Sequence, residues 1–420
     1  MEAILLLVIV LSGMYSIRRG IVSPHNLFSL FFLMIYLGWF VFVQLINVFV
    51  VYKQSDETVL LVLLVSSLFY FVYFLTYFLL TRTPKIVVCK NRQLVSLLTM
   101  ERCYKYFFLI GMFGLLLFIL KNGFVLFKVS SAGYEQKNIA NAGSGVARIL
   151  YSVGFSYYIA CRLIVKPHEI KSTFLISAAL GILIFVAIGG GRASALLPLT
   201  TCVFYLLWNG RFSFIKYAIY AVSFISLIFM TTVIRYNVSS DKINDKLIAS
   251  VIYKLQGSFS PADSVGVLLE NYDKFIRYPE AALNNFIYFI PRALWVDKPI
   301  IIQNASGYFT KEILNYPVEL TISVTLIGEL LIYAGYIGVF IGAVFTAFYV
   351  RFLDVIYESS KNDNFFKAWY LISFISFFSL MREGLAVTMR DTITSIIITI
   401  LVVLTFHSLS FLQGLIRRKT

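Results

Sequence analysis

Two acidic side chains are candidates for proton transfer. Glu329 interrupts an apolar run at residues 322–334, and a carboxylate in such a place can act as a general base that removes a proton from a hydroxyl group. Asp263, at the start of an expected helix, is the second candidate for the same role. A structural alternative exists for Glu329, because a carboxylate near a helix start is stabilised by the helix dipole.

A glycine-rich turn offers a place to hold an anion. Residues 189–191 are three consecutive glycines, and Arg192 follows them. Glycines permit backbone conformations and close approaches that other residues forbid, and a guanidinium held there can bind a phosphate in bidentate fashion. The alternative is a tight turn between helices whose arginine extends to the lipid headgroups.

A second anion site is suggested by the stretch Ile-Pro-Arg-Ala-Leu-Trp-Val-Asp-Lys-Pro at 290–299. Its two prolines and its tryptophan stiffen the backbone. Arg292 and Lys298 can bind an anion while Trp295 packs on a sugar ring or an isoprenoid chain. Alternatively, Arg292 pairs with Asp297 in an ordinary structured loop.

Two arginines near the C-terminal end complete the set of candidate cations. Arg382 precedes Glu383, and Arg390 precedes Asp391. Each can bind an anionic substrate, or each can form a local ion pair with its acidic neighbour.

The composition defines the elements that must position these residues. Of the 420 residues, 59% are hydrophobic and only 14% are charged, whereas soluble domains have about 25% charged residues. This excludes a cytosolic enzyme, a disordered chain and a secreted disulfide scaffold. Apolar stretches of about 20 residues, the length that crosses a bilayer, predict an all-α polytopic membrane protein with about 11 transmembrane helices.

The spans predict three regions. Transmembrane helices 1–8 occupy residues 1–234, one large structured loop occupies 235–320, and helices 9–11 occupy 321–420. The segment 321–350 is longer than one span requires. It is either a single span or a re-entrant segment followed by a helix that begins near Gly335.

Charge asymmetry predicts the orientation. Just over half of the 36 Lys and Arg residues fall on one side, which the positive-inside rule makes cytoplasmic, so the N-terminus, the long loop and the candidate residues face outside. The net charge of +15 is then largely a membrane feature and predicts no nucleic-acid partner. The histidines fall toward the cytoplasmic side, so we expect no metal site and no cofactor: they are His25, His168 and His407.

Three segments carry a resemblance to a known family: Gly-Gly-Gly-Arg192, Pro291-Arg-Ala-Leu-Trp…Lys298-Pro299, and Leu326-Ile-Gly-Glu329…Tyr333-Ala-Gly335-Tyr-Ile-Gly338-Val. The chain resembles the O-antigen polymerase (Wzy) family, oligosaccharide repeat-unit polymerases of the bacterial inner membrane. The resemblance makes the 235–320 loop periplasmic. It also implies a chain-length-regulating co-polymerase as a partner, besides membrane lipid.

The activity implied by the resemblance belongs to lipopolysaccharide biosynthesis. A membrane glycosyltransferase would polymerise undecaprenyl-pyrophosphate-linked oligosaccharide repeat units at the periplasmic face. It would transfer the growing glycan to the non-reducing end of a new lipid-linked repeat unit. Glu329, or Asp263, would be the base, and fixed cations would stabilise the departing pyrophosphate. The substrate-binding candidates are Arg192, Arg292, Lys298, Arg382, Arg390 and Trp295.

Two other functions remain as alternatives. The related O-antigen ligases are similar in architecture but use a periplasmic histidine, which the predicted topology does not supply. A flippase or transporter of lipid-linked oligosaccharide is expected to carry charges within several spans and has little need of a long outer loop.

Overall fold

The computed structural model describes residues 22–49, 55–82, 97–125, 145–189, 192–210, 257, 260–287, 295, 303–316, 322–397 and 399–400. All regular secondary structure among these residues is helical. They fall into two units. The first takes its residues from Met1–Ile86, Phe214–Val355 and Ser376–Arg390, and the second from Val87–Ser213, Ile356–Ile375 and Asp391–Thr420.

Within the described residues, 7 helices are long and apolar enough to cross a membrane: Pro24–Val43, Asp56–Arg82, Tyr104–Asn122, Val146–Val165, Pro167–Ala187, Thr325–Ser360 and Asn364–Glu383. A polytopic all-helical membrane protein is therefore confirmed. The expected spans at 3–17 and 215–234, and most of the one at 391–412, lie outside the described residues. The total of about 11 transmembrane helices, the three-region division and the periplasmic loop stay predictions.

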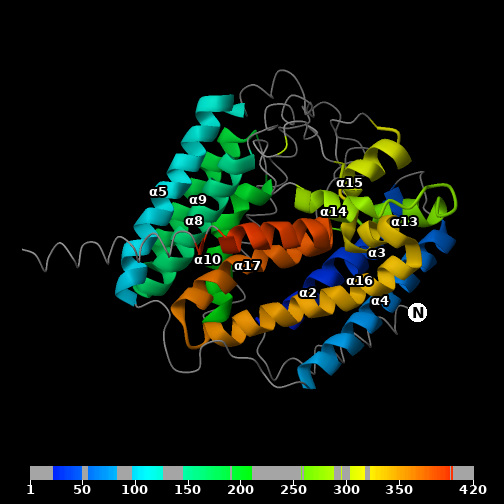
Figure 1. The fold of residues 1–420 in the computed structure, drawn as a ribbon, viewed down its shortest axis with the longest axis horizontal. Helices are drawn as coiled ribbons and strands as arrows, with labels where there is room; N and C mark the ends of the chain where they lie inside the picture. The colour runs from blue at the N-terminus through cyan, green and yellow to red at the C-terminus, as the bar shows by residue number, and fades with distance from the viewer. Residues whose placement is uncertain are drawn as a thin grey trace, which may run out of the picture. The chain divides into compact units, whose positions relative to one another are not determined.

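Four helical stretches form the body of the first unit (Figure 1). They are α2 (Pro24–Phe32), which continues through the π-helical turn η1 (Leu33–Leu37) into α3 (Gly38–Phe49), then α4 (Asp56–Arg82), most of α16 (Thr325–Ser360) and the end of α17 (Asn364–Glu383).

Buried polar contacts at one end of these helices fix the direction in which they run. Tyr77 Oη donates to Asp354 Oδ2 at 2.7 Å, and His25 Nδ1 lies 2.8 Å from Tyr73 Oη. The beginning of α2 thus meets the ends of α4 and α16. Consecutive spans α2–α3 and α4 therefore run in opposite directions, as the charge asymmetry predicts.

The expected outer loop contributes short helices to the first unit: α13 (Asp263–Glu270), α14 (Glu280–Ile287), α15 (Ala305–Tyr308) and the π-helical turn η4 (Phe309–Ile313). The sequence predicts a helix beginning near Ser260 with Pro261 in its first turn, but the helix begins at Asp263 without a side-chain cap. Ser260 Oγ instead donates to Met34 O at 2.6 Å. Met34 lies in η1, where a π-helical turn interrupts the regular hydrogen-bond ladder.

The helix α16 reverses its direction near its start. Ala334 and Gly335 have non-helical backbone angles, and the φ of Gly335 is 61°. In a straight helix Leu330 and Gly342 would lie about 18 Å apart. Instead, Leu330 packs directly against Gly338 and Gly342, whose missing Cβ atoms leave the room for it. The segment 325–333 is therefore a re-entrant half-helix, and the helix proper begins at Tyr336.

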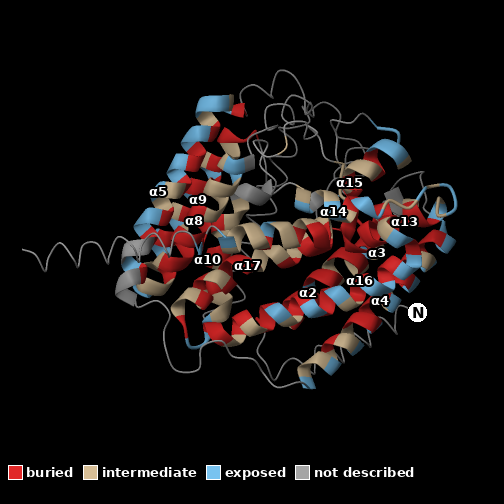
Figure 2. Cartoon of the chain, viewed as in Figure 1, coloured by how far each residue is buried: buried red, intermediate tan, exposed pale blue. Residues whose placement is uncertain are grey.

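The second unit contains α5 (Leu97–Asn122), α8 (Gly145–Val165), the 3₁₀ turn η2 (Pro167–Glu169), α9 (Ile170–Ala187) and α10 (Arg192–Trp208). α5, α8 and α9 lie side by side (Figure 1). Gly154 of α8 meets the backbone of α5 at Gly111 and Phe107, a close helix–helix approach of the kind small residues permit in membranes. Exposed positions recur along one side of α5 (Figure 2).

The contact between Leu330 and Gly342 predicts a compensating pair of substitutions. A Cβ at Gly342 would overlap the Leu330 side chain, so Gly342→Ala should destabilise the protein by about 1–3 kcal/mol. Adding Leu330→Ala removes the overlap, and the double variant should lose less stability than the two single changes together. Thermal unfolding of the purified protein in detergent measures this coupling.

Two further substitutions serve as controls for this prediction. A Cβ at Gly338 meets the backbone oxygen of Leu330, which no side-chain truncation removes, so Leu330→Ala should not rescue Gly338→Ala. Gly257 has no atom within 4 Å of its Cβ position, and Gly257→Ala should leave the unfolding temperature nearly unchanged. Additive effects of Gly342→Ala and Leu330→Ala would contradict the re-entrant packing.

Candidate active site

Glu329 lies inside the first unit, on the re-entrant half of α16. Its exposed fraction is 1%. Tyr333, one turn further along, donates its hydroxyl to Glu329 Oε1 at 2.6 Å. Because α16 begins at Thr325 and Glu329 falls beyond its first turn, the helix dipole does not account for this carboxylate, since that effect is confined to the first turn.

The other oxygen of the Glu329 carboxylate holds the end of α17. Leu385 N donates to Glu329 Oε2 at 2.5 Å. Gly384, with a φ of 96°, ends α17, and residues 385–397 are again helical. The first amide groups of a helix have no partner within it, so Glu329 supplies a buried acceptor to this helix start. Any Cβ at Gly384 would overlap the carboxylate.

Asp263, the second candidate base, is half-buried at the first position of α13. Trp39 Nε1 donates to Asp263 Oδ1 at 2.5 Å. The two candidate carboxylates belong to helices that touch, since Gly328 of α16 packs against Leu268 of α13. The structure therefore brings Glu329 and Asp263 into one packed region, and each carboxylate has a neutral donor.

The structure does not describe the side chains of three candidate cations. Arg292 and Lys298 lie outside the described residues, and so does the side chain of Arg192, the first residue of α10 in the second unit. Trp295 is described and is half-buried. Gly189 has a φ of 72°, and its Cβ position lies against Val125, so this glycine does permit a close approach at the turn before Arg192.

The structure describes the side chains of both candidate arginines near the C-terminal end. Arg382 Nε lies 3.6 Å from Glu383 Oε1, which is the local ion pair that the sequence left as an alternative. Ser323 Oγ donates to the same Glu383 oxygen at 3.2 Å. Arg390 is half-buried in the helical stretch 385–397. In the part of the chain that is described, no three His, Cys, Asp or Glu side chains gather as metal ligands would.

A cation that the sequence analysis did not single out lies beside the reversal of α16. Arg277 Nη1 donates to two backbone oxygens, those of Tyr272 at 3.0 Å and Phe275 at 3.1 Å. Its guanidinium carbon lies 4.0 Å from the ring centroid of Tyr272 and 4.6 Å from that of Phe275. Arg277 Nε lies close to Gly335 of α16, and the Tyr336 ring lies tilted against that of Tyr272 with 4.5 Å between centroids.

Neighbouring tyrosines fix the loop that carries Arg277. Tyr278 N donates to Ile332 O at 2.9 Å, and the Tyr278 ring stacks on Tyr308 with 5.0 Å between centroids. Burial, together with the nearby Glu312 carboxylate, raises the pKa of Tyr308. Its hydroxyl therefore stays protonated and donates to Ile276 O at 2.6 Å. The loop is bound directly to the half-helix that carries the candidate base.

Three residues of this site were missed by sequence reasoning. Tyr333 stands four positions after Glu329, a spacing that places two side chains on one helix face; this signal was available. Gly384 and Arg277 gave no local signal, because their importance comes from contacts with distant parts of the chain.

Gly384 provides a test of how Glu329 is held. Gly384→Ala should displace the Glu329 carboxylate and also strain a backbone with positive φ. Gly210 has a φ of 62° but no atom within 4 Å of its Cβ position, so Gly210→Ala carries the backbone strain alone, about 1–2 kcal/mol. We expect a larger fall in unfolding temperature for Gly384→Ala. Equal effects of the two substitutions would contradict the contact between Gly384 and Glu329.

Comparison with known protein families gives a match over nearly the whole chain. The family model described as WzyE protein, O-antigen assembly polymerase, matches residues 2–420. No solved structure matches the chain.

Proposed function

The chain belongs to the WzyE family of O-antigen assembly polymerases, and from this premise we propose that it polymerises undecaprenyl-pyrophosphate-linked oligosaccharide repeat units. The growing glycan leaves its lipid carrier and is joined to the non-reducing end of a new lipid-linked repeat unit. The protein is a multi-pass protein of the bacterial inner membrane, and its site faces the periplasm. A chain-length-regulating co-polymerase is its expected partner.

The proposed reaction exchanges one glycosidic bond for another. A hydroxyl oxygen of the acceptor sugar forms a bond to the anomeric carbon of the growing glycan, and the bond from that carbon to the pyrophosphate oxygen breaks. The electron pair departs with the lipid pyrophosphate, which gains negative charge. The acceptor hydroxyl loses one proton, which a general base must take.

The observation that carries this proposal is the hydrogen-bonded pair of Glu329 and Tyr333. Glu329 is 1% exposed, whereas Tyr333 is half-buried and its hydroxyl donates to Glu329 Oε1. We therefore place the Tyr333 hydroxyl between the acceptor and the carboxylate. It receives the acceptor's proton as it passes its own proton to Glu329.

The leaving pyrophosphate requires fixed positive charge, which stabilises a developing anion without reorganisation of solvent. In our proposal Arg192, Arg292 and Lys298 supply it, and Trp295 packs on the sugar or the isoprenoid chain. We assign Arg382 and Arg390 secondary roles in binding the substrate. Arg382 already lies within ion-pair distance of Glu383.

Glu329→Gln should abolish efficient polymerisation. The amide keeps an oxygen that can accept the hydrogen bond from Leu385 N, but it loses basicity. Since general base catalysis contributes about 10²- to 10⁴-fold, the ladder of glycan products should collapse toward single repeat units. Reconstitution with synthetic lipid-pyrophosphate repeat units, followed by gel analysis of the products, measures this. Tyr333→Phe should also slow polymerisation, because it removes the hydroxyl that relays the proton.

Asp263→Asn is the matched control. It retains an acceptor for Trp39 Nε1, so the ladder should be normal. A normal ladder in Glu329→Gln together with a lost ladder in Asp263→Asn would make Asp263 the base and leave Glu329 with only its structural role.

The periplasmic placement of the site predicts selective labelling. In a variant whose four native cysteines are replaced, Ile276→Cys should react with an impermeant thiol reagent applied to spheroplasts, because Ile276 is 82% exposed beside Arg277. His168→Cys lies at the expected cytoplasmic end, and the side chain there is 77% exposed. It should react only after permeabilisation. The reverse pattern would place the site in the cytoplasm.

A further inference from the structure

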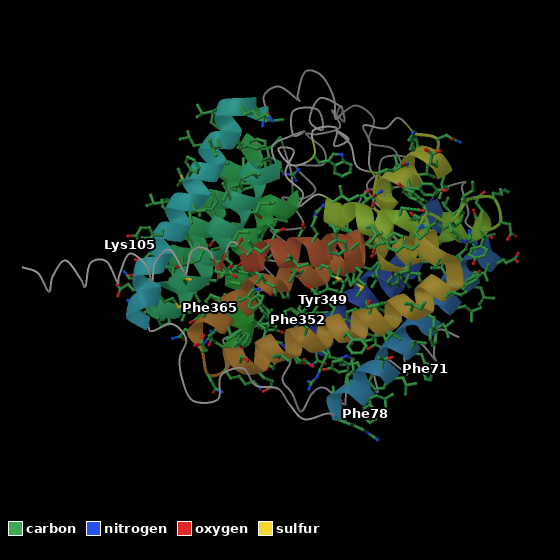
Figure 3. All side chains as sticks on the ribbon, viewed as in Figure 1. Phe71, Phe78, Lys105, Tyr349, Phe352 and Phe365 are labelled. Atoms are coloured by element: carbon green, nitrogen blue, oxygen red, sulfur yellow. The ribbon has the colours of Figure 1, made fainter. Side chains whose placement is uncertain are left out.

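The helix proper of α16 presents a row of exposed apolar and aromatic side chains on one side. The face consists of apolar residues exposed by 42% to 69%, on one side of the helix: Ile337, Phe340, Ile341, Phe345, Phe348 and Phe352. We call it the α16 phenylalanine face. Phe352 marks its end away from the reversal in Figure 3. The face rises about 23 Å along the helix, most of the roughly 30 Å of a bilayer's hydrocarbon core.

The exposed side of α4 has a different composition. Its exposed apolar residues are Leu60, Leu64, Leu68, Phe71, Leu75 and Leu79, with exposed fractions of 40% to 55%. Leucine is sufficient for contact with ordinary lipid tails. Four phenylalanines on the α16 phenylalanine face instead provide rigid flat surfaces, which lose little side-chain entropy on contact. α4 therefore offers an internal comparison within the same unit.

A cation lies at the reversal end of this face. Arg277 packs beside Gly335, immediately before the face begins. Its guanidinium is fixed by two backbone oxygens and two aromatic rings, and no carboxylate of the described residues pairs with it. A guanidinium oriented in this way can donate its remaining N–H groups to phosphate oxygens.

We propose that the α16 phenylalanine face and Arg277 together bind the polyprenyl diphosphate carrier of the donor glycan. The isoprenoid chain lies along the phenylalanines, and the diphosphate contacts Arg277. This inference rests on the proposed function. The loop that carries Arg277 is bound to the half-helix that carries Glu329, because Tyr278 N donates to Ile332 O at 2.9 Å, so the bound diphosphate stands in the same region as the base, as a leaving group must.

A binding experiment tests the proposal without requiring catalysis. Undecaprenyl diphosphate that carries a diazirine in its isoprenoid chain is photolysed with the purified full-length protein in detergent, and labelled peptides are identified by mass spectrometry. We expect labels within residues 336–352. Arg277→Ala should reduce labelling at least about tenfold, the lower range for losing a charge-assisted hydrogen bond, and Arg277→Lys should restore only part of it.

Matched variants separate a specific face from general lipid contact. Replacing Phe340, Phe345, Phe348 and Phe352 together by leucine keeps the helix apolar and should still reduce labelling about tenfold, whereas Phe71→Leu on α4 should not change it. An excess of phosphatidylglycerol should compete weakly. Equal labelling of α4 and α16, or full competition by phosphatidylglycerol, would show that α16 contacts only bulk lipid and would overturn the proposal.

The result of the photolabelling experiment can be judged separately from the polymerisation assay. Glu329→Gln should lose the product ladder and keep the label on α16. A normal ladder with labels only outside 336–352 would refute the lipid site and leave the polymerase function standing. Labels on α16 without any polymer from the unaltered protein would refute the function and retain the lipid site.

Discussion

The reversal of α16 at Ala334 and Gly335 is the constraint on which the site depends. The helix has 36 residues, and a straight helix of that length would extend about 54 Å, beyond the roughly 40–45 Å of a whole bilayer. Folding the first nine residues back against Gly338 and Gly342 shortens it to one span. The reversal carries Glu329 into the protein, where its hydrogen bonds replace those that water would supply.

Three carboxylates inside the first unit accept hydrogen bonds from neutral donors. Asp263 accepts from the Trp39 indole, Glu329 from Tyr333 and a backbone amide, and Asp354 from the Tyr77 hydroxyl. Of these three, Asp354 also has a basic neighbour within ion-pair distance, since Arg351 Nη1 lies 3.5 Å from its Oδ2. A neutral donor orients a carboxylate without neutralising it, whereas a bound arginine would suppress its ability to accept a proton. Glu329 therefore has an environment compatible with proton transfer.

The sequence predicts what depends on local pattern and misses what depends on distant contacts. Apolar length and charge asymmetry are sufficient for an all-helical membrane protein and for the opposite directions of α2 and α4, because both are set by the bilayer. The long segment at 321–350 signals either one span or a re-entrant half-helix. Only the packing of Leu330 on Gly342 decides between them. Likewise, Gly384 and Arg277 acquire their roles from Glu329 and Gly335, which lie far away in the chain.

The two oxygens of Glu329 allow one residue to serve structure and chemistry. Oε2 is occupied by Leu385 N, which fixes the carboxylate, and Oε1 faces the Tyr333 hydroxyl through which a proton can arrive. On the other side of the reversal lies Arg277. The loop that carries Arg277 is bound to the same half-helix as Glu329, because Tyr278 N donates to Ile332 O at 2.9 Å. In our proposal the reversal therefore brings the base and a cation for the departing diphosphate into one region of the first unit.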